Sequence, residues 1–365
     1  MSSVERIFNF SAGPAVLPLP VLVEAQRDLL ALPGAGMSIL EISHRSPRFD
    51  EIILTAEADI AKLLGLSSDY QVLFLQGGAS QQFSMVPMNF MHGKSADYVN
   101  SGSWAKKAMK EAKKEGEVAV IWSGDDEKFS RMPDPGELEY NQNAAYVHIT
   151  ANETIEGIEW HMDPDTGNIP LVCDASSDFM SRPIEANKYS LIYAGAQKNA
   201  GPAGVTIVII RKDMLEEQVA TTLPTMLDYK IMAENKSLYN TPTTFGIYII
   251  GLVAKWLIND IGGLPAMHKL NKEKGGLIYD AIDTSGGYYR GHSQPQSRSL
   301  MNITFRLPSE DLEKQFVKEA KELKMDGLKG HRSVGGIRAS VYNAFPIEGC
   351  KALVDFMKEF KRKNG

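Results

Sequence analysis

A lysine between two apolar segments is the residue whose type and position most suggest chemistry in this sequence. Lys198 lies within LIYAGAQKNAGPAGVTIVII, residues 191–210, where two runs rich in β-branched residues flank a loop of Gly, Ala, Gln and Asn. It is the only charged residue between Lys188 and Arg211. Most lysines lie on solvated turns, and that is the simple alternative here. A lysine held between buried strands instead has a lowered pKa, which makes it a usable amine nucleophile.

A carboxylate precedes this lysine at the end of another apolar run. Asp174 closes Leu-Val-Cys-Asp, residues 171–174, and lies 24 positions before Lys198. Ser176 and Ser177 follow it, so the residue could simply cap a helix. Alternatively, its charge could hold a protonated heteroaromatic nitrogen. Pyridoxal phosphate needs such a partner, because its protonated ring is the electron sink for a substrate carbanion.

Three further segments could complete a cofactor site. Gln-Gly-Gly-Ala-Ser-Gln at 76–81 joins a predicted strand to a predicted helix, where free backbone N–H groups and the helix dipole favour a phosphate. This turn matches neither GxGxxG nor a P-loop, so the nucleotide fingerprints are lacking. Trp104 could stack on a flat ring, although such a residue more often packs in the core. Asn-Thr-Pro-Thr-Thr at 240–244 could cap the next helix or hold a phosphate.

The composition narrows the class of function. The chain has 365 residues and a formal net charge of −6 without a long run of one sign, which disfavours nucleic-acid and membrane-surface binding. Its two cysteines, Cys173 and Cys350, form no CxxC, which indicates a reducing cytoplasm, no disulfide framework and no structural metal. The N-terminus does not resemble a signal peptide. The longest apolar stretch, 244–257, contains Lys255 and is expected to be too short to span a bilayer.

Alternating apolar patterns predict the elements that position these residues. Helices are expected at 19–32, 49–64 and 104–115. Strands are expected at 71–75, 96–99, 118–122, 145–149, 171–174, 191–194 and 205–211. This alternation predicts an α/β fold, in which a mostly parallel sheet is covered by helices on both faces. Because ligands on such sheets bind at the carboxyl ends of the strands, Asp174 is expected to lie at a site.

The pattern changes after residue 240. Two helices are expected at 244–258 and 261–282. The tail is expected to form strand, helix, strand and helix at 301–306, 312–324, 337–340 and 347–361. We therefore predict a large domain at 16–259 and a smaller C-terminal α+β domain at 260–365, to which residues 1–15 are assigned.

Eight segments carry a family resemblance that covers nearly the whole chain. They are FNFSAGPAVLP at 8–18, SHRS at 43–46, QGGASQQFSMVPMN at 76–89, ANETIEGIEW at 151–160, YAGAQKNAGPAG at 193–204, YNTPTTFGIY at 239–248, SRSLMNITFRL at 297–307 and GHRSVGGIRASVYNA at 330–344. With these segments the chain resembles the phosphoserine aminotransferases, which are fold-type I pyridoxal-phosphate enzymes among the class V aminotransferases. The resemblance implies a homodimer with active sites at the subunit interface. It also implies the reaction of 3-phosphohydroxypyruvate with glutamate.

The resemblance implies a role for each candidate residue. Lys198 matches the lysine that binds the cofactor covalently, and Asp174 matches the partner of the ring nitrogen. Trp104 matches the stacking ring, and Thr154 matches a hydroxyl beside the ring oxygen. The positions that bind the cofactor phosphate fall on Ala79, Ser80 and Gln197, and on Asn240 and Thr241 from the neighbouring subunit. The cations that bind substrate fall on His44, Arg45, His331, Arg332 and Arg338.

The substrate cations also make sense chemically. Phosphoserine, glutamate and their keto acids each carry an α-carboxylate at one end and a second anion at the other. Arginine binds a carboxylate bidentately, and Arg338 follows Gly335-Gly336, which leaves room for a ligand. Each such cation could otherwise be an ordinary surface residue. Some family members carry an arginine where this chain has Ser80, which leaves open how much of the distal anion His44 and Arg45 hold.

Two other interpretations remain. A cysteine desulfurase would use the same cofactor but needs a mobile loop cysteine. Cys173 lies in a predicted strand and Cys350 opens a predicted helix, so neither fits. A binding protein without catalysis would not need Lys198 and Asp174. The sequence leaves open whether a longer phosphorylated keto acid, on the route to vitamin B6, is also an acceptor.

Overall fold

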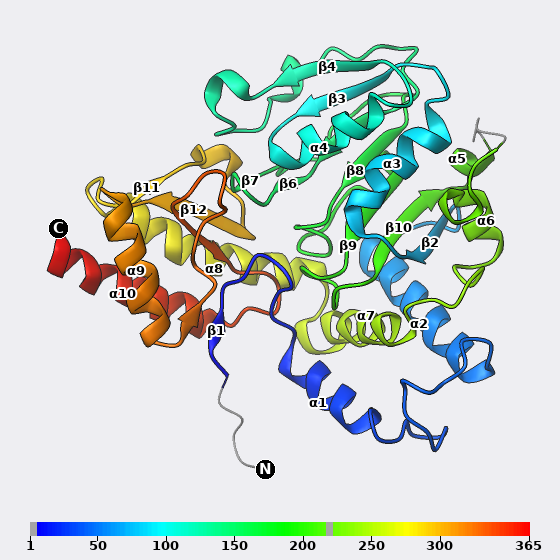
Figure 1. Ribbon diagram of the computed structural model, residues 1–365, viewed down its shortest axis with the longest axis horizontal. Helices are drawn as coiled ribbons and strands as arrows, with labels where there is room; N and C mark the ends of the chain where they lie inside the picture. Colours follow the sequence, from blue (N-terminus) through cyan, green and yellow to red (C-terminus); the bar gives the residue numbers. More distant parts are fainter. Residues whose placement is uncertain (1–5, 217–221) are drawn as a thin grey trace.

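The computed structural model, which describes residues 6–216 and 222–365, is built on a seven-stranded sheet with the order β2-β10-β9-β8-β5-β3-β4 (Figure 1). Its strands are β2 (Tyr70–Leu75), β3 (Ala96–Asn100), β4 (Val118–Ser123), β5 (Val147–Thr150), β8 (Leu171–Asp174), β9 (Leu191–Gly195) and β10 (Thr206–Arg211). The pairs β3–β4, β3–β5, β5–β8 and β8–β9 are parallel. Strand β10 runs antiparallel to β9 and β2. The expected mostly parallel sheet is therefore confirmed.

Helices cover both faces of this sheet because its strands are apolar on both sides. In β9, Leu191 and Tyr193 pack in one core cluster, whereas Ile192 and Ala194 pack in another. The first cluster contains residues of α3 (Gly78–Phe90) and α4 (Ser103–Ala112). The second contains residues of α2 (Pro47–Leu64) and α7 (Thr244–Trp256). Burial on both faces explains the near-continuous apolar runs.

The long apolar helix differs from the expectation in its length. After Trp256 it continues through a π-helical turn, Leu257–Ile261, so the segment from Thr244 to Ile261 reaches 18 residues. By length and composition such a helix could cross a membrane. Here it packs against α2 and against α1 (Leu19–Asp28), and Ile247, Ile250 and Val253 are fully buried. We therefore interpret it as a core helix.

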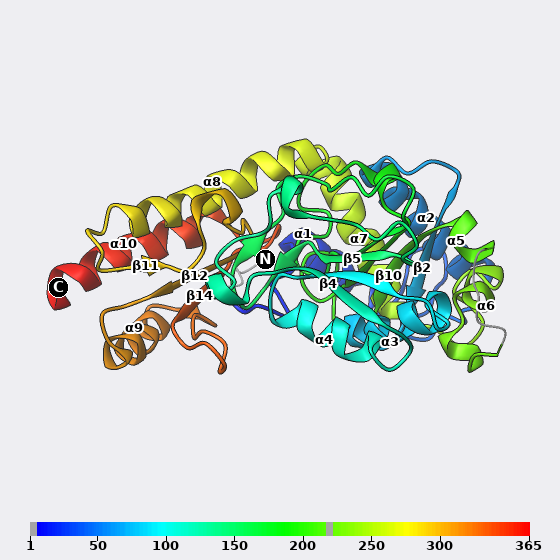
Figure 2. The same ribbon diagram turned by 90° about the horizontal axis from the view of Figure 1, so that it is seen from above.

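A smaller sheet forms beside the first one. Helix α8 (Leu264–Asp283) leads to the antiparallel strands β11 (Arg290–Gly291), β12 (Asn302–Arg306) and β14 (Ile337–Ser340). Helices α8, α9 (Glu310–Glu322) and α10 (Ile347–Asn364) lie beside this sheet (Figure 2). Strand β1 (Phe8–Asn9) pairs with β13 (Met325–Asp326), which brings the N-terminal segment to this unit. The boundary near residue 260 stays a prediction.

A second buried lysine joins α8 to the segment that follows β14. Lys274 is fully buried, and its Nζ donates to the carbonyls of Val341 at 3.0 Å and Tyr342 at 2.6 Å. It also donates to the carbonyls of Asn343 and Phe345, both at 3.3 Å. Burial lowers the pKa of Lys274 to about 7. These four contacts fix the turn between β14 and α10.

The remaining elements are short. They are the hairpin β6 (Asn152–Glu153) and β7 (Ile158–Glu159), and the helices α5 (Lys212–Glu216) and α6 (Tyr229–Glu234). Helix α1 ends at Asp28 rather than at the expected Leu32, because the Leu32 amide donates to the Met37 carbonyl at 2.8 Å in a turn. The other predicted helices and strands differ from the observed ones mainly by a few residues at their ends.

Candidate active site

The carboxyl ends of β8 and β9 bring the two central candidates together. Asp174 is the last residue of β8, and Lys198 lies three residues beyond Gly195, which ends β9. The strands are parallel neighbours, so both ends lie on the same edge of the sheet. Thr154, from the hairpin turn between β6 and β7, accepts a hydrogen bond from Lys198 Nζ at 2.7 Å.

The environment of Lys198 makes its amine easier to deprotonate than that of an exposed lysine. Burial lowers the pKa of Lys198 to about 8, although the charges of Asp174 and Glu153 oppose this shift. The positive charge of Arg338 lowers the pKa further. The amine is therefore unprotonated more often than that of an exposed lysine, and a nucleophile or a general base requires the unprotonated form.

Asp174 is a buried carboxylate that has no cationic partner among the described residues. Its side chain is 3% exposed, and Oδ1 accepts from the Ser176 amide at 2.9 Å. Burial raises the pKa of Asp174, while Ser176 and the charge of Lys198 lower it. In the described residues no salt bridge to Asp174 is formed within 4.0 Å, so a protonated ring nitrogen would supply the missing partner.

Trp104 lies beside the reactive amine. It is the second residue of α4, and its ring centroid is 5.3 Å from Lys198 Nζ. Its indole Nε1 is buried and has no hydrogen-bond partner among the described residues. This placement fits a ring that stacks on a flat cofactor between the indole and the sheet edge.

The glycine turn before α3 presents backbone donors. Gly77 has a φ of +90°, and a Cβ there would come within 1.9 Å of Gln81 Oε1, so the turn requires glycine. Ala79 and Ser80 lie in the first turn of α3, which has no side-chain cap. Gln197 packs over Gly195, where an added Cβ would lie only 2.7 Å from Gln197 Oε1. The N–H groups of this turn and Gln197 are suitable for a phosphate.

Asn240 and Thr241 contact the base of this turn in the same chain. Asn240 Nδ2 donates to Gln76 Oε1 at 3.3 Å, and Gln76 Nε2 donates to the Thr241 carbonyl at 3.4 Å. Both residues precede α7 and are partly or fully exposed. Their expected reach into a neighbouring subunit stays a prediction.

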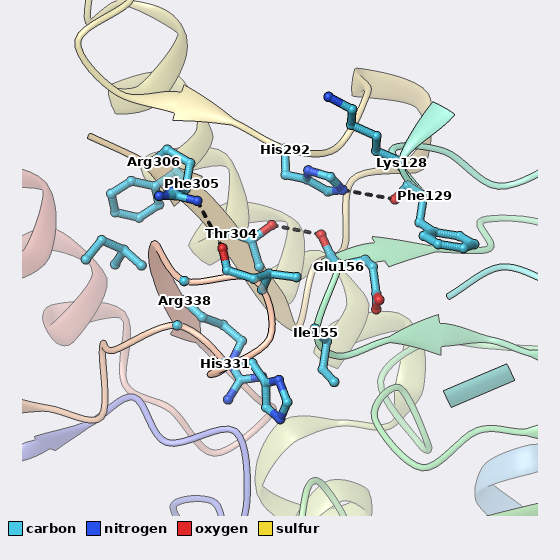
Figure 3. A pocket seen from close by; sticks show the side chains of 14 residues that line it. Lys128, Phe129, Ile155, Glu156, His292, Thr304, Phe305, Arg306, His331 and Arg338 are labelled. Atoms are coloured by element: carbon cyan, nitrogen blue, oxygen red, sulfur yellow. Dashed lines mark hydrogen bonds between the residues drawn. The ribbon is translucent and has the colours of Figure 1, made fainter. Parts of the chain in front are cut away.

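One of the five candidate substrate cations, Arg338, is linked to the amine through Thr154, and a second, His331, lines a cavity together with Arg338. Arg338, on β14, donates from Nη1 to the Thr154 carbonyl at 3.3 Å, and its Nε is buried without a partner among the described residues. His331 lines the same cavity of about 160 Å³ (Figure 3). Burial and the charge of Arg338 lower the pKa of His331. The cavity therefore has a fixed cation beside a histidine that a bound anion would help to protonate.

The other three cations lie elsewhere in the single chain. Arg332 is exposed and lines a groove on the outer side of its loop. His44 and Arg45 precede α2, and neither lines the cavity of Arg338 and His331. Within the described residues the structure thus gathers Lys198 and Arg338, but not the outer cations.

Comparisons with known proteins agree with this geometry. The model of the family described as aminotransferase class-V matches residues 7–353. The chain belongs to this family. It is 57% identical over 363 residues to a phosphoserine aminotransferase of Desulfosudis oleivorans, covering 99% of each protein. It is 54% identical over 361 residues to one of Lysinibacillus sphaericus, again covering 99% of each.

Solved structures of class V aminotransferases confirm the expected fold. The phosphoserine aminotransferase from Bacillus circulans subsp. alkalophilus superimposes with a TM-score of 0.97 at 53% identity, covering 99% of this chain and all of the other. A structure of pyridoxal-phosphate-bound phosphoserine aminotransferase from Trichomonas vaginalis gives a TM-score of 0.90 at 41% identity, covering 97% of this chain and all of the other.

Sequence reasoning missed several residues that line the cavity of Arg338 and His331. The cavity is also lined by the basic residues Lys128, His292 and Arg306 and by the acidic Glu156. Glu156 binds across to β12, because its carbonyl accepts from Thr304 Oγ1 at 2.8 Å (Figure 3). No spacing in the sequence separates these residues from ordinary surface charges. For Glu156 the only available signal is its position two residues after Thr154.

Proposed function

We propose that this chain is a phosphoserine aminotransferase with pyridoxal 5'-phosphate as its cofactor. It transfers the amino group of L-glutamate to 3-phosphohydroxypyruvate, giving O-phospho-L-serine and 2-oxoglutarate. The observation that carries this proposal is the link through Thr154. Its hydroxyl is 2.7 Å from Lys198 Nζ, and its carbonyl is 3.3 Å from Arg338 Nη1. One residue therefore ties the reactive amine to a cation for the α-carboxylate. The 50–57% identity to relatives bearing that name supports the substrate.

The residues present fit the cofactor. Pyridoxal phosphate supplies the carbon that carries the amino group and a ring that withdraws electrons from the substrate. The residues proposed to hold it come from the carboxyl edge of the sheet, from the first turns of α3 and α4, and from the β6–β7 hairpin. They are Ala79, Ser80, Trp104, Thr154, Asp174, Gln197 and Lys198. Asp174 keeps the proton on the ring nitrogen, and Trp104 covers one face of the ring.

Each side chain has a defined task in the reaction. Arg338 binds the α-carboxylate of every substrate, which orients the Cα–H bond toward Lys198. Lys198 Nζ takes the proton from Cα of glutamate and returns a proton to Cα when phosphoserine forms. His331 and Arg332 hold the distal anion, together with His44 and Arg45 of a second subunit.

A run of exposed apolar side chains between residues 19 and 40 supports a homodimer. They lie on α1 and on the loop that leads to His44 and Arg45. They are Leu19, Val23, Leu29, Leu30, Met37 and Leu40. Leu30 is 86% exposed, which is unusual for a leucine on a monomer surface with such neighbours. A second copy of this chain would bury this patch and would carry His44 and Arg45 toward the partner's cavity.

The substrate assignment is tested with a panel of amino acceptors. Purified enzyme loaded with pyridoxal phosphate should aminate 3-phosphohydroxypyruvate with a higher kcat/KM than oxaloacetate, glyoxylate or pyruvate. The vitamin B6 precursor 3-hydroxy-2-oxo-4-phosphooxybutanoate belongs in the same panel, since its anion plan is similar. An acceptor without a phosphate that reacts as well as 3-phosphohydroxypyruvate would refute the proposal.

Subunit mixing tests the shared site. One variant lacks Lys198, and the other has bulky apolar residues at Asn240 and Thr241. In a mixed dimer one site carries both lesions and the other carries neither. Random exchange should therefore restore up to about a quarter of the wild-type rate. No recovery, despite exchange verified by mass spectrometry, would place these residues in their own subunit's site.

The proposed location is the cytoplasm. Cys173 and Cys350 are both buried and unpaired. Free buried thiols are typical of proteins kept in a reducing compartment.

A further inference from the structure

Two carboxylates from the β6–β7 hairpin bind the first turn of α4. Gly102 precedes the helix and has no side chain to cap it. Instead, Glu156 Oε1 accepts from the Ser103 amide at 3.0 Å. Glu153 accepts from the amides of Trp104 and Ala105, both at 2.9 Å. The first N–H groups of a helix have no partner within the helix, so these carboxylates satisfy them and also stabilise the positive end of the helix dipole.

Glu153 is a buried carboxyl group whose oxygens face hydrogen-bond donors. Its residue is 0% exposed, and Oε1 also accepts from Ser101 Oγ at 3.3 Å. A Cβ at Gly102 would lie 2.7 Å from the Glu153 carboxyl carbon, so the acid sits directly against the backbone. Burial and the charge of Glu156 raise the pKa of Glu153 to about 8, although the amides of Ala105 and Trp104 lower it. The two backbone amides can only donate, so they favour the ionised form of the carboxyl, and only the Ser101 hydroxyl could accept a carboxyl proton.

The β6–β7 hairpin that carries Glu153 also contacts the Lys198 amine directly. Thr154 directly follows Glu153, and its hydroxyl accepts from Lys198 Nζ at 2.7 Å. The Trp104 ring, on the helix turn that Glu153 holds, lies 5.3 Å from the same Nζ. Two neighbouring residues of one hairpin thus set the positions of a hydroxyl and of a ring around one amine.

We propose that Glu153 is a positioning residue of the reaction: it fixes the Trp104 ring against the cofactor by holding the first turn of α4. This inference rests on the proposed cofactor and on the proposed role of Trp104. It does not depend on which keto acid is the acceptor.

The charge effect has a definite sign. The charges of four groups from different elements act on the pKa of Lys198. They are Asp174 on β8, Glu153 on the hairpin, Arg338 on β14 and Asp178 in the turn after β8. The three acids favour the protonated amine, and Arg338 disfavours it. Removal of the Glu153 charge should therefore shift the titration of the site toward lower pH.

The main test is Glu153→Gln, which keeps the size of the side chain, removes its charge and turns an NH₂ toward a backbone N–H. Three quantities are measured: the Kd for pyridoxal phosphate, the pH midpoint of the visible absorption band of the holoenzyme, and the melting temperature of the apoenzyme. We expect about tenfold weaker cofactor binding and a midpoint displaced to lower pH. A lower melting temperature with an unchanged Kd and midpoint would overturn the proposal, because Glu153 would then only cap a helix.

A matched control and a second variant separate the positioning of Trp104 from the effect of the Glu153 charge. Asp228→Asn removes a carboxylate that caps α6 by accepting from the Lys230 amide at 2.8 Å, and it should leave both cofactor readouts unchanged. Glu153→Asp keeps the charge but is too short to reach both amides. It should weaken cofactor binding while its midpoint stays near that of the wild type. If Glu153→Asp binds the cofactor normally, the positioning role is wrong.

A double variant tests the route through the indole. If Glu153 acts through the ring, Glu153→Gln should weaken cofactor binding much less in a Trp104→Ala background than in the wild type. If the losses of cofactor affinity in the two single variants simply add in the double variant, Glu153 does not act through the Trp104 ring. A wild-type protein that binds no pyridoxal phosphate would instead refute the proposed function, so the two failures are distinguishable.

Discussion

The two ends of the candidate site are built differently. At the cofactor end, Asp174 and Lys198 come from the ends of adjacent parallel strands, and hydrogen bonds hold Asp174 and Thr154 in the single chain. At the distal end, Arg332 and Arg45 are exposed and come from loops. The sheet therefore brings Asp174 and Lys198 together in a single chain, whereas Arg332 and Arg45 are not gathered. On the proposed function, the substrate anion or a second subunit would complete the distal end.

Arg338 and Thr154 lie between these two ends, and we call this pair the joint. Arg338 belongs to the smaller sheet but donates to Thr154 of the hairpin beside the larger one. Gly335 and Gly336 have φ values of +70° and +71°, which let the loop turn back from Arg332 onto β14. The comparison predicts that substitutions lose less activity as they move from the cofactor end, through this joint, toward the loops.

The largest effect is expected at the cofactor end. Lys198→Ala should lower kcat by more than about 10⁴-fold, because the same amine binds the cofactor and moves the proton. The fold should persist, as judged by circular dichroism. Borohydride reduction followed by peptide mapping should place the cofactor on Lys198, and a label on another lysine would contradict the assignment.

Asp174→Asn should be the next most damaging change. The cofactor should still bind, but without a charge its ring nitrogen would not stay protonated, and we expect kcat to fall by about 100-fold or more. Rates at saturating glutamate provide the measurement. Near-normal turnover would remove Asp174 from this role and would weaken the contrast between the two ends.

The joint and the loop should differ in their substrate profiles. Arg338→Lys should lower kcat/KM by about 10–100-fold for every substrate, since all of them carry an α-carboxylate. Arg332→Ala should lower it by about tenfold for phosphoserine and less for glutamate, because a phosphate carries more charge. Identical profiles for the two variants would mean that the ends of the pocket are misassigned.

The smallest effect concerns stability. The ordinary lysine pKa is 10.5, whereas burial lowers the pKa of Lys198 to about 8. Below pH 8 both states are protonated, so the fold carries the cost of a buried charge. Between pH 8 and 10.5 only the unfolded state keeps the proton, so stability rises with pH. Lys198→Met should therefore stabilise the apoenzyme at pH 7, by up to about 3 kcal/mol, and the gain should vanish toward pH 10.5.

Urea unfolding of the apoenzyme at several pH values measures this gain. Exposed Lys351, on α10, provides the control, and its replacement by methionine should give a stability change that does not vary in this way with pH. A constant difference between Lys198→Met and the wild type from pH 7 to 10.5 would contradict the buried-charge explanation.

The cofactor end could be predicted because its signals are local. β-Branched runs end at Asp174 and near Lys198, and parallel strands bring such ends together. Glu153 could not be found in this way, since its partner amides lie 48 and 49 positions earlier in the chain. For His44 and Arg45, only the family resemblance indicated a role. In the single chain neither residue lines the cavity of Arg338 and His331, so the structure adds no signal of its own for them. The length of the α7 segment was underestimated because its last turn, Leu257–Ile261, includes polar residues.

Among the described residues, burial lowers the pKa of two lysines, and these differ in exposure: Lys198 is partly exposed, whereas Lys274 is fully buried. Four carbonyl groups surround the Lys274 amine, which is fully buried. Because Lys274 is fully buried, an aldehyde should react with Lys198 rather than with Lys274, although the pKa of both amines is low. Labelling of Lys274 would therefore report opening of the smaller unit. An acylating reagent can modify it only after the turn from Val341 to Phe345 has separated from α8, so its rate of labelling measures how often that separation occurs.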